Sequence, residues 1–197
     1  RKSRIEPQVS FTVSEWIKKP KEIIHTIQEK FYSKNLIVRS SAISEDSFIN
    51  SNAGTYLSIL DVDVANQKVI LESIESVINS YEDKNLDNQV LVQPMLEDVS
   101  VSGVIFTRTL SENAPYYVVN FDDVSKTTDS ITSGSSIDNK TLVISRSDLD
   151  NVKNYIPKSL SKLMPAIIEI ENLLDFKSLD IEFAIGINNN VHILQVR

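Results

Sequence analysis

The sequence predicts an α+β protein in which a mainly antiparallel sheet is flanked by helices. Three β-rich runs lie at 89–95, 102–107 and 116–121, and their connections are too short to hold crossover helices. Amphipathic helices are expected at 64–81 and 159–175, where apolar residues recur with the 3.6-residue period. Strands joined by short connections pair in antiparallel fashion, so a doubly wound parallel sheet is disfavoured.

The remaining elements follow from shorter β-rich runs and from turn residues. Four further strands are expected: 8–13, 36–39, 55–60 and 141–145. A helix should follow the first of them, with Ser14 as its cap and a break or restart at Pro20, because proline has no amide hydrogen. The stretches 109–115 and 122–139 are rich in Asn, Ser and Asp and are expected to be loops.

Composition excludes several classes of site and partner. The 197 residues carry a net charge of -7, which argues against a nucleic-acid or anionic-membrane surface. There is no cysteine, so disulfides, thiol nucleophiles and zinc–thiolate sites are excluded. No apolar run approaches the roughly 20 residues of a membrane span, and the first residues lack the apolar core of a signal peptide. A cytoplasmic protein that binds neither nucleic acid nor membrane is therefore predicted.

The end of the chain, DIEFAIGINNNVHILQVR, predicts a β-hairpin with one polar face. If the asparagines at 188–189 form a two-residue turn, Glu182 pairs with Gln195, and Asp180 pairs with Arg197. Side chains alternate along a strand, so these four polar groups share one face. The apolar residues expected on the opposite face are Ile181, Phe183, Ile185, Leu194 and Val196.

Two interpretations of the polar face stay open. A carboxylate and an amide carbonyl on neighbouring strands are oxygen ligands that suit Mg²⁺, and Arg197 can bind a phosphate of the same ligand with two parallel hydrogen bonds. The face then predicts a magnesium–nucleotide clamp. Alternatively, Asp180 and Arg197 form an ordinary cross-strand ion pair on a solvated face.

A second arginine ends a β-rich run in the stretch NLIVRSSAISEDS at 35–47. The run delivers Arg39 to the start of a loop of serines and acids. This placement indicates an anionic ligand, although an arginine at the end of a strand is also an ordinary surface residue.

Several separated stretches resemble, in order, the nucleotide-binding domain of the phosphoenolpyruvate synthase and pyruvate phosphate dikinase family. The matching stretches are VRSSA at 38–42, ED at 45–46, NAGTYLSILDV at 52–62, VLVQPM at 90–95, VSGVIFTR at 101–108, DIEF at 180–183 and LQVR at 194–197. The resemblance runs from about residue 36 to residue 197 and implies an ATP-grasp fold.

The resemblance also implies roles for individual residues. Arg39 and Arg197 should act as catalytic contacts to the ATP phosphates, Glu182 and Gln195 should hold Mg²⁺, Gln93, Pro94, Met95 and Leu96 should line the adenine pocket, and Asp129 falls where the family's ribose-contacting glutamate lies. Pro94 cannot donate a hydrogen bond, so Met95 or Leu96 must supply any N–H to the base. Ordinary packing for Met95 and a polar loop position for Asp129 are the alternative interpretations.

Two departures from the family pattern concern segments that bind the nucleotide. The family's GLGE segment is replaced by KTTD at 126–129, and no GGKG-type segment with a phosphate-binding lysine occurs in residues 1–35. We therefore expect 1–35 to be a shortened or replaced N-terminal lobe segment and 36–197 to be the ATP-grasp domain of a longer multidomain protein. Neither His25 nor His192 is expected to replace the phospho-accepting histidine of the family's swivelling domain.

The function implied by the resemblance is Mg²⁺-dependent phosphoryl transfer from ATP. The chain would be the ATP-binding domain of a phosphotransferase similar to phosphoenolpyruvate synthase or pyruvate phosphate dikinase. Its partners would be an unidentified phosphoryl acceptor and a histidine-bearing swivelling domain. Two other functions stay open: a nucleotide-binding regulatory module without catalysis, and an ATP-grasp ligase that joins a carboxylate to an amine.

Overall fold

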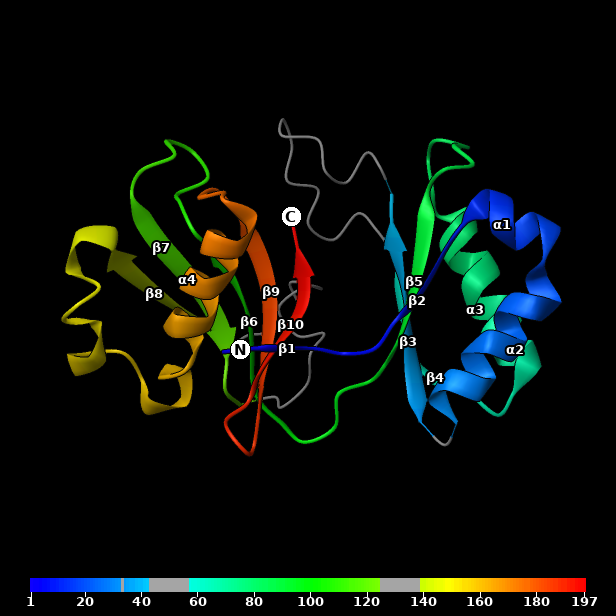
Figure 1. Ribbon diagram of the computed structural model, residues 1–197, viewed down its shortest axis with the longest axis horizontal. Coiled ribbons are helices and arrows are strands. Elements are labelled where there is room, and N and C mark those ends of the chain that lie inside the picture. The colour runs from blue at the N-terminus through cyan, green and yellow to red at the C-terminus, as the bar shows by residue number, and fades with distance from the viewer. Residues whose placement is uncertain (33, 43–56, 125–138) are drawn as a thin grey trace. The chain divides into compact units, whose positions relative to one another are not determined.

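The computed structural model describes residues 1–32, 34–42, 57–124 and 139–197 (Figure 1). The chain forms two compact units, each with its own sheet and its own apolar core. The 7–95 unit comprises Pro7–Met95, and the 96–197 unit comprises Leu96–Arg197 together with the first six residues, Arg1–Glu6. Strands that pair almost entirely antiparallel, with helices packed on them, confirm the predicted α+β class.

The 7–95 unit contains a four-stranded sheet with the order β2-β5-β3-β4, in which every neighbouring pair is antiparallel. Its elements are β2 (Val9–Thr12), α1 (Val13–Lys18), α2 (Pro20–Phe31), β3 (Asn35–Ser41), β4 (Ser58–Asp63), α3 (Gln67–Asn79) and β5 (Gln89–Pro94). All three helices lie on one side of this sheet (Figure 1). They bury one face of the strands, and the side chains of Arg39 and Gln93 belong to the other face.

The start of α1 differs from the sequence prediction. Thr12, not Ser14, caps the helix: the Thr12 Oγ1 accepts a hydrogen bond from the Glu15 N–H at 3.1 Å, and the Glu15 carboxylate accepts one from the Thr12 N–H at 2.8 Å. This reciprocal capping box satisfies two backbone donors at once, which a cap at Ser14 does not achieve. The predicted restart at Pro20 is confirmed, because α2 begins there.

The 96–197 unit contains a six-stranded sheet with the order β1-β10-β9-β6-β7-β8. Its elements are β1 (Arg4–Ile5), β6 (Val99–Phe106), β7 (Tyr116–Asp122), β8 (Lys140–Ser145), three 3₁₀ turns at Arg146–Asp148, Val152–Asn154 and Lys158–Leu160, α4 (Leu163–Leu174), β9 (Asp180–Gly186) and β10 (Val191–Val196). Only β1 and β10 pair in parallel among the described strands. The three runs expected in one antiparallel sheet are therefore divided: β6 and β7 pair, but β5 lies in the other unit.

A glycine sets the spacing of the two central strands of this sheet. Gly103 of β6 pairs with Phe183 of β9. A Cβ at Gly103 would lie 2.5 Å from the Asn120 carbonyl oxygen and 2.6 Å from the Phe183 ring. Only glycine leaves this space, so the Phe183 ring can lie against the β6 backbone and fix the position of β9.

A buried polar network ties α4 to the sheet. Glu171 of α4 accepts a hydrogen bond from the Tyr117 hydroxyl at 2.6 Å and two from the Arg146 guanidinium at 2.8 and 3.0 Å. The guanidinium also stacks on the Tyr117 ring, 4.4 Å from its centroid. Burial and the Glu171 carboxylate raise the pKa of Tyr117, so the phenol stays protonated as a donor. The network fixes the helix on the face that carries the core.

The terminal hairpin has the predicted pairs but reaches them by a different route. The turn has three residues, since Gly186 N–H donates to Asn190 O and Asn189 has a left-handed backbone with φ 60°. A bulge at Leu194 then shifts the register by one residue. Beyond the bulge the predicted pairs are confirmed: Glu182 faces Gln195, and Asp180 and Arg197 exchange backbone hydrogen bonds.

The same bulge corrects the predicted apolar face. Val191 and Ile193 of β10 pack into the core, whereas Val196 is 37% exposed and Leu194 lies at the bulge. His192, which strict alternation placed with the apolar residues, pairs with Ala184 and lies on the polar face. Among the described helices, none is both long and apolar enough to cross a membrane.

Candidate functional site

Four polar side chains lie on one face of the β9–β10 hairpin, opposite the α4 core. Asp180 and Glu182 alternate on β9 with the buried Ile181 and Phe183. Gln195 is the β10 partner of Glu182, and Arg197 follows it by two residues. The strand geometry therefore brings together the four groups that the sequence predicts as a cluster.

Arg197 is the centre of this cluster. Its Nη2 donates to the Gln195 Oε1 at 2.9 Å, and its Nη1 lies 3.7 Å from the Glu182 Oε1 and 4.0 Å from the Asp180 Oδ2. The guanidinium is thus held by side chains of both strands.

Asp180 is the member of the cluster whose charge is disfavoured by burial. Burial, reinforced by the charge of Glu182, raises the pKa of the Asp180 carboxyl to about 6, although Arg197 acts in the opposite direction. Its Oδ1 atom is buried and has no hydrogen-bond partner among the described residues. A buried carboxylate oxygen without a partner is costly unless a proton or a metal ion neutralises it.

The donor set fits Mg²⁺. Glu182 and Asp180 supply carboxylate oxygens, and Gln195 supplies an amide oxygen on the neighbouring strand. Mg²⁺ prefers a small number of such hard oxygen ligands and completes its shell with water and phosphate oxygens. In the part of the chain that the structure describes, no group of three or more His, Cys, Asp or Glu residues gathers at one point. A site with two acids and an amide agrees with partial coordination by the protein.

In the 7–95 unit, Arg39 and Gln93 lie on the face of the sheet that the helices leave uncovered. Arg39 is in β3, where it pairs with Ser58 of β4 and Leu91 of β5, and it is only 8% exposed. Gln93 is 5% exposed, and its amide donates to the Gln8 Oε1 at 3.0 Å. The strand continues past Arg39 to Ser41, so this arginine lies within the sheet and not at the end of a strand as predicted.

The backbone contacts of the predicted adenine-binding segment, Gln93 to Leu96, are partly within its own sheet. The Met95 N–H donates to the Asn35 carbonyl at 2.8 Å, and the Met95 sulfur accepts from the Asp61 N–H at 3.0 Å. Met95 is thus committed to its own sheet, and Pro94 has no N–H. Leu96 is the first residue of the 96–197 unit. Asp129 lies outside the described residues.

Sequence reasoning missed three polar residues on the face that carries Glu182. Ser102 and Asp122 pair across β6 and β7 and are 2% and 1% exposed. His192 lies 2.8 Å from the Glu6 carboxylate, measured from Nδ1 to Oε1. Their placement depends on the order of the strands in the sheet. Ser102 pairs with Ala184, and Ala184 lies on the same face of β9 as Glu182.

The sequence of the first part of the chain matches a known family model. The model, described as the pyruvate phosphate dikinase AMP/ATP-binding domain, covers residues 6–123, which is more than half of the 197 residues. The chain belongs to this family. The family match does not extend to the β9–β10 hairpin, so the roles of Glu182, Gln195 and Arg197 depend on their motif and geometry. No curated protein sequence matches the chain.

Solved structures confirm the ATP-grasp fold expected from the family. PH1788 from Pyrococcus horikoshii Ot3 has a TM-score of 0.58 at 12% identity, over 99% of this chain and 83% of that protein. The D-alanine–D-alanine ligase of Helicobacter pylori has a TM-score of 0.50 at 13% identity, over 99% of this chain and 49% of the ligase. The D-alanine–D-alanine ligase of Coxiella burnetii has a TM-score of 0.50 at 10% identity, over 98% of this chain and 42% of the ligase. The chain thus spans about half the length of these ligases, and the likeness concerns the fold alone.

Proposed function

We propose that this chain binds MgATP through the polar face of the β9–β10 hairpin and takes part in phosphoryl transfer from ATP. It would do so as the ATP-binding part of a phosphotransferase similar to phosphoenolpyruvate synthase or pyruvate phosphate dikinase. The observation that carries the proposal is the cluster around Arg197, in which the Glu182 and Gln195 side chains approach the guanidinium from two strands. Family membership supports the nucleotide as ligand.

The roles within the cluster follow from charge. Arg197 would bind a phosphate oxygen with its fork of N–H donors and stabilise the charge of the transferred group. Glu182 and Gln195 would hold Mg²⁺, which when bound neutralises phosphate charge. Asp180 would contribute a third oxygen, because its buried Oδ1 has no hydrogen-bond partner among the described residues. Both carboxylates also orient Arg197 before the nucleotide arrives.

The remaining roles are proposed from the family resemblance. Arg39 would be a second phosphate contact, and Gln93 to Leu96 would line the adenine. Leu96 would supply the N–H to the base, since Met95 donates its own to Asn35. Asp129 is proposed as the ribose contact.

The domain organisation is proposed on the same basis. Of the two expectations for residues 1–35, a shortened N-terminal lobe segment is proposed over a replaced one, because the family match begins at residue 6. A histidine-bearing swivelling domain is proposed as a partner. The acceptor itself is proposed to lie outside residues 1–197, because His25 pairs with Glu29 on an exposed helix surface and His192 is tied to Glu6.

Isothermal titration of MgATP into the wild-type chain and into three single variants tests the nucleotide site. Arg197→Ala should weaken ATP at least tenfold with or without Mg²⁺, because hydrogen bonds to charged groups contribute about 1.5–3 kcal/mol. Glu182→Gln should remove most of the increase in ATP affinity that Mg²⁺ gives. It should change the affinity for metal-free ATP little. Arg39→Ala should weaken ATP as Arg197→Ala does.

A matched control is Glu75→Ala, which removes an exposed carboxylate from α3. Its affinity for MgATP should equal that of the wild type. Equal affinities in the wild type and all three site variants would refute the nucleotide site. Phosphoryl transfer is tested separately by chromatography of ADP and AMP formed from ATP, with Glu182→Gln as the inactive reference. Binding without either product, with the swivelling domain present, would instead favour a regulatory module.

A further inference from the structure

A polar groove lies in the 96–197 unit, and none of the four clustered residues lines it. It has a volume of about 480 Å³, which is within the range of roughly 300–1,000 Å³ typical of small-ligand sites. Three segments form its walls: residues 1–4, the start of α4 and the β9–β10 turn with the first residue of β10. All three belong to one compact unit, so the walls are parts of one packed structure.

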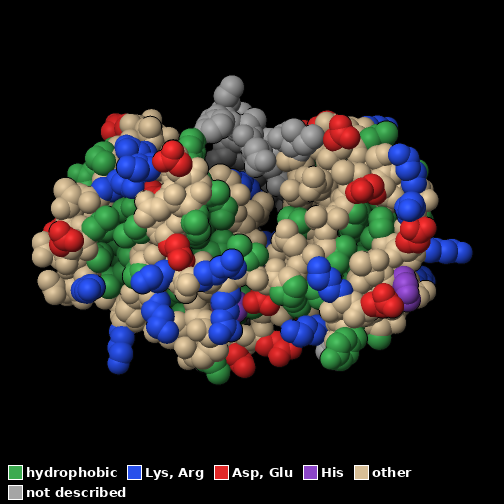
Figure 2. Space-filling model, viewed as in Figure 1, with side chains coloured by type: hydrophobic (Ala, Val, Ile, Leu, Met, Phe, Trp, Pro, Cys, Tyr) green, Lys and Arg blue, Asp and Glu red, His purple; other side chains and the backbone are tan. Residues whose placement is uncertain are grey.

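The groove is basic although the chain is acidic. Arg1, Lys2, Arg4 and Lys162 line it, and none of the described acidic residues does. Arg4 pairs with His192, whose side chain lies on the polar face of the sheet, so we assign the other three cations to the groove. Figure 2 shows Lys and Arg side chains gathered around the place where the N-terminus lies in Figure 1.

These cations are available to a ligand. Among the described residues, none of the side chains of Arg1, Lys2 and Lys162 takes part in an ion pair. Glu169 of α4 contacts the same segment through the backbone: its Oε2 accepts a hydrogen bond from the Lys2 N–H at 2.6 Å. That contact fixes the N-terminal segment against α4 and leaves the lysine ammonium group to solvent.

The helix adds to the positive potential. Lys162 stands at the start of the 12-residue α4, and within the described residues neither a side-chain cap nor an acid in the first turn offsets that end of the helix. Ser161, Asn189 and Asn190 supply hydroxyl and amide groups to the same walls. In the described part of the chain no aromatic side chain lines the groove, so none of these residues can stack on a nucleobase.

We propose that this groove binds a small anion with several phosphate groups, and that it recognises charge and not a base. Three cations, a helix N-terminus and neutral donors match the oxygens of such an anion. The site is distinct from the proposed nucleotide site and does not depend on it. Occupation would join the N-terminal segment to α4 and to the hairpin turn.

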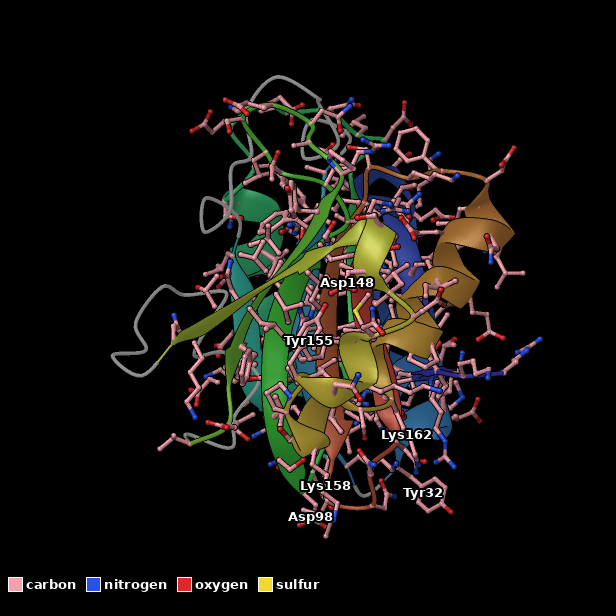
Figure 3. The ribbon with its side chains drawn as sticks, turned by 90° about the vertical axis from the view of Figure 1, so that its left-hand side faces the viewer. Tyr32, Asp98, Asp148, Tyr155, Lys158 and Lys162 are labelled. Carbon is pink, nitrogen blue, oxygen red and sulfur yellow. The ribbon has the colours of Figure 1, made fainter. Side chains whose placement is uncertain are left out.

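The test titrates inorganic tripolyphosphate, in metal-free buffer at physiological salt, into the whole chain and two matched double variants. The groove variant is Lys2→Gln with Lys162→Gln. The control is Lys153→Gln with Lys158→Gln, which removes the same charge from two exposed lysines of the same unit that do not line the groove. Lys158 and Lys162 both lie toward the lower end of the view in Figure 3.

The groove variant should bind tripolyphosphate at least tenfold more weakly than the wild type, and the control should change less than threefold. In an Arg197→Ala background, which weakens the proposed nucleotide site, the two groove substitutions should still lower the affinity for tripolyphosphate at least tenfold, which separates the groove from the nucleotide site. Equal affinity in the groove variant and the wild type, or an equal loss in the control, would overturn the proposal. Equally tight binding of sulfate would also overturn it, because the groove would then recognise any anion.

Discussion

The burial of Asp180 predicts that its carboxylate destabilises the ligand-free chain. The pKa of this group is raised from 3.8 to about 6, mainly because burial disfavours the charged form. The native state therefore binds its proton more tightly than the unfolded state does. The loss of unfolding free energy caused by the buried carboxylate is absent below the unfolded pKa. It grows as the pH rises from 3.8 to about 6 and is complete above that value.

The magnitude follows from the size of the shift. About two pKa units correspond to about 3 kcal/mol of unfolding free energy at neutral pH. Since the side chain is 23% exposed, solvent relaxation lowers this figure, and we expect Asp180→Asn to stabilise the chain by about 1–2 kcal/mol at pH 7.5. At pH 4.5 the gain should fall below about half of that value, because the native carboxyl is then already protonated.

Urea unfolding followed by far-UV circular dichroism at both pH values measures the gain. Asp150→Asn, at an exposed position of the same unit, is the control for the change of aspartate to asparagine. A gain for Asp180→Asn that is equal at pH 4.5 and 7.5 would show that burial of the charge is not its cause. Loss of stability at pH 7.5 would refute the reasoning outright.

Three further substitutions test the framework of the fold by the same unfolding measurement. Gly103→Ala should destabilise by about 1–3 kcal/mol, because its methyl group would overlap the Phe183 ring; wild-type stability would show that the strands can separate. Glu171→Gln should lower the unfolding free energy by about 2–4 kcal/mol, since Arg146 loses its carboxylate partner. A change near zero would show that the ion pair does not stabilise the fold. Thr12→Ala should cost about 1 kcal/mol, whereas Ser14→Ala should cost less, and the reverse order would contradict the cap at Thr12.

The sequence allows the hairpin pairs to be predicted because polar and apolar residues must alternate between two faces. It does not reveal the turn, since an asparagine-rich segment suits both two-residue and three-residue turns. The bulge at Leu194 is also hidden, because an extra residue in a strand leaves no compositional signal. The prediction of Glu182 opposite Gln195 succeeded because the longer turn and the bulge offset each other in register.

Longer-range features were less accessible. Residues 1–6 join the 96–197 unit through a two-residue parallel pairing with β10, which is too short to give a sequence pattern. The charged environment of Asp180 likewise depends on side chains brought together by strand order. Local chemistry, such as the helix start at Pro20, was readable because it depends on the residue itself.

The bulge at Leu194 divides β10 into two halves, in which odd-numbered side chains point to opposite faces of the sheet. Before it, Val191 and Ile193 face the core; after it, Gln195 and Arg197, which are also odd-numbered, face the polar side. Deletion of Leu194 itself would keep every one of these pairings, because the two halves would join as a regular strand. Deletion of a neighbour such as His192 would instead change which side chains the first half of the strand turns toward the core. The strand can thus lose a residue at one position, and at that position the odd-numbered side chains change from the core to the polar face.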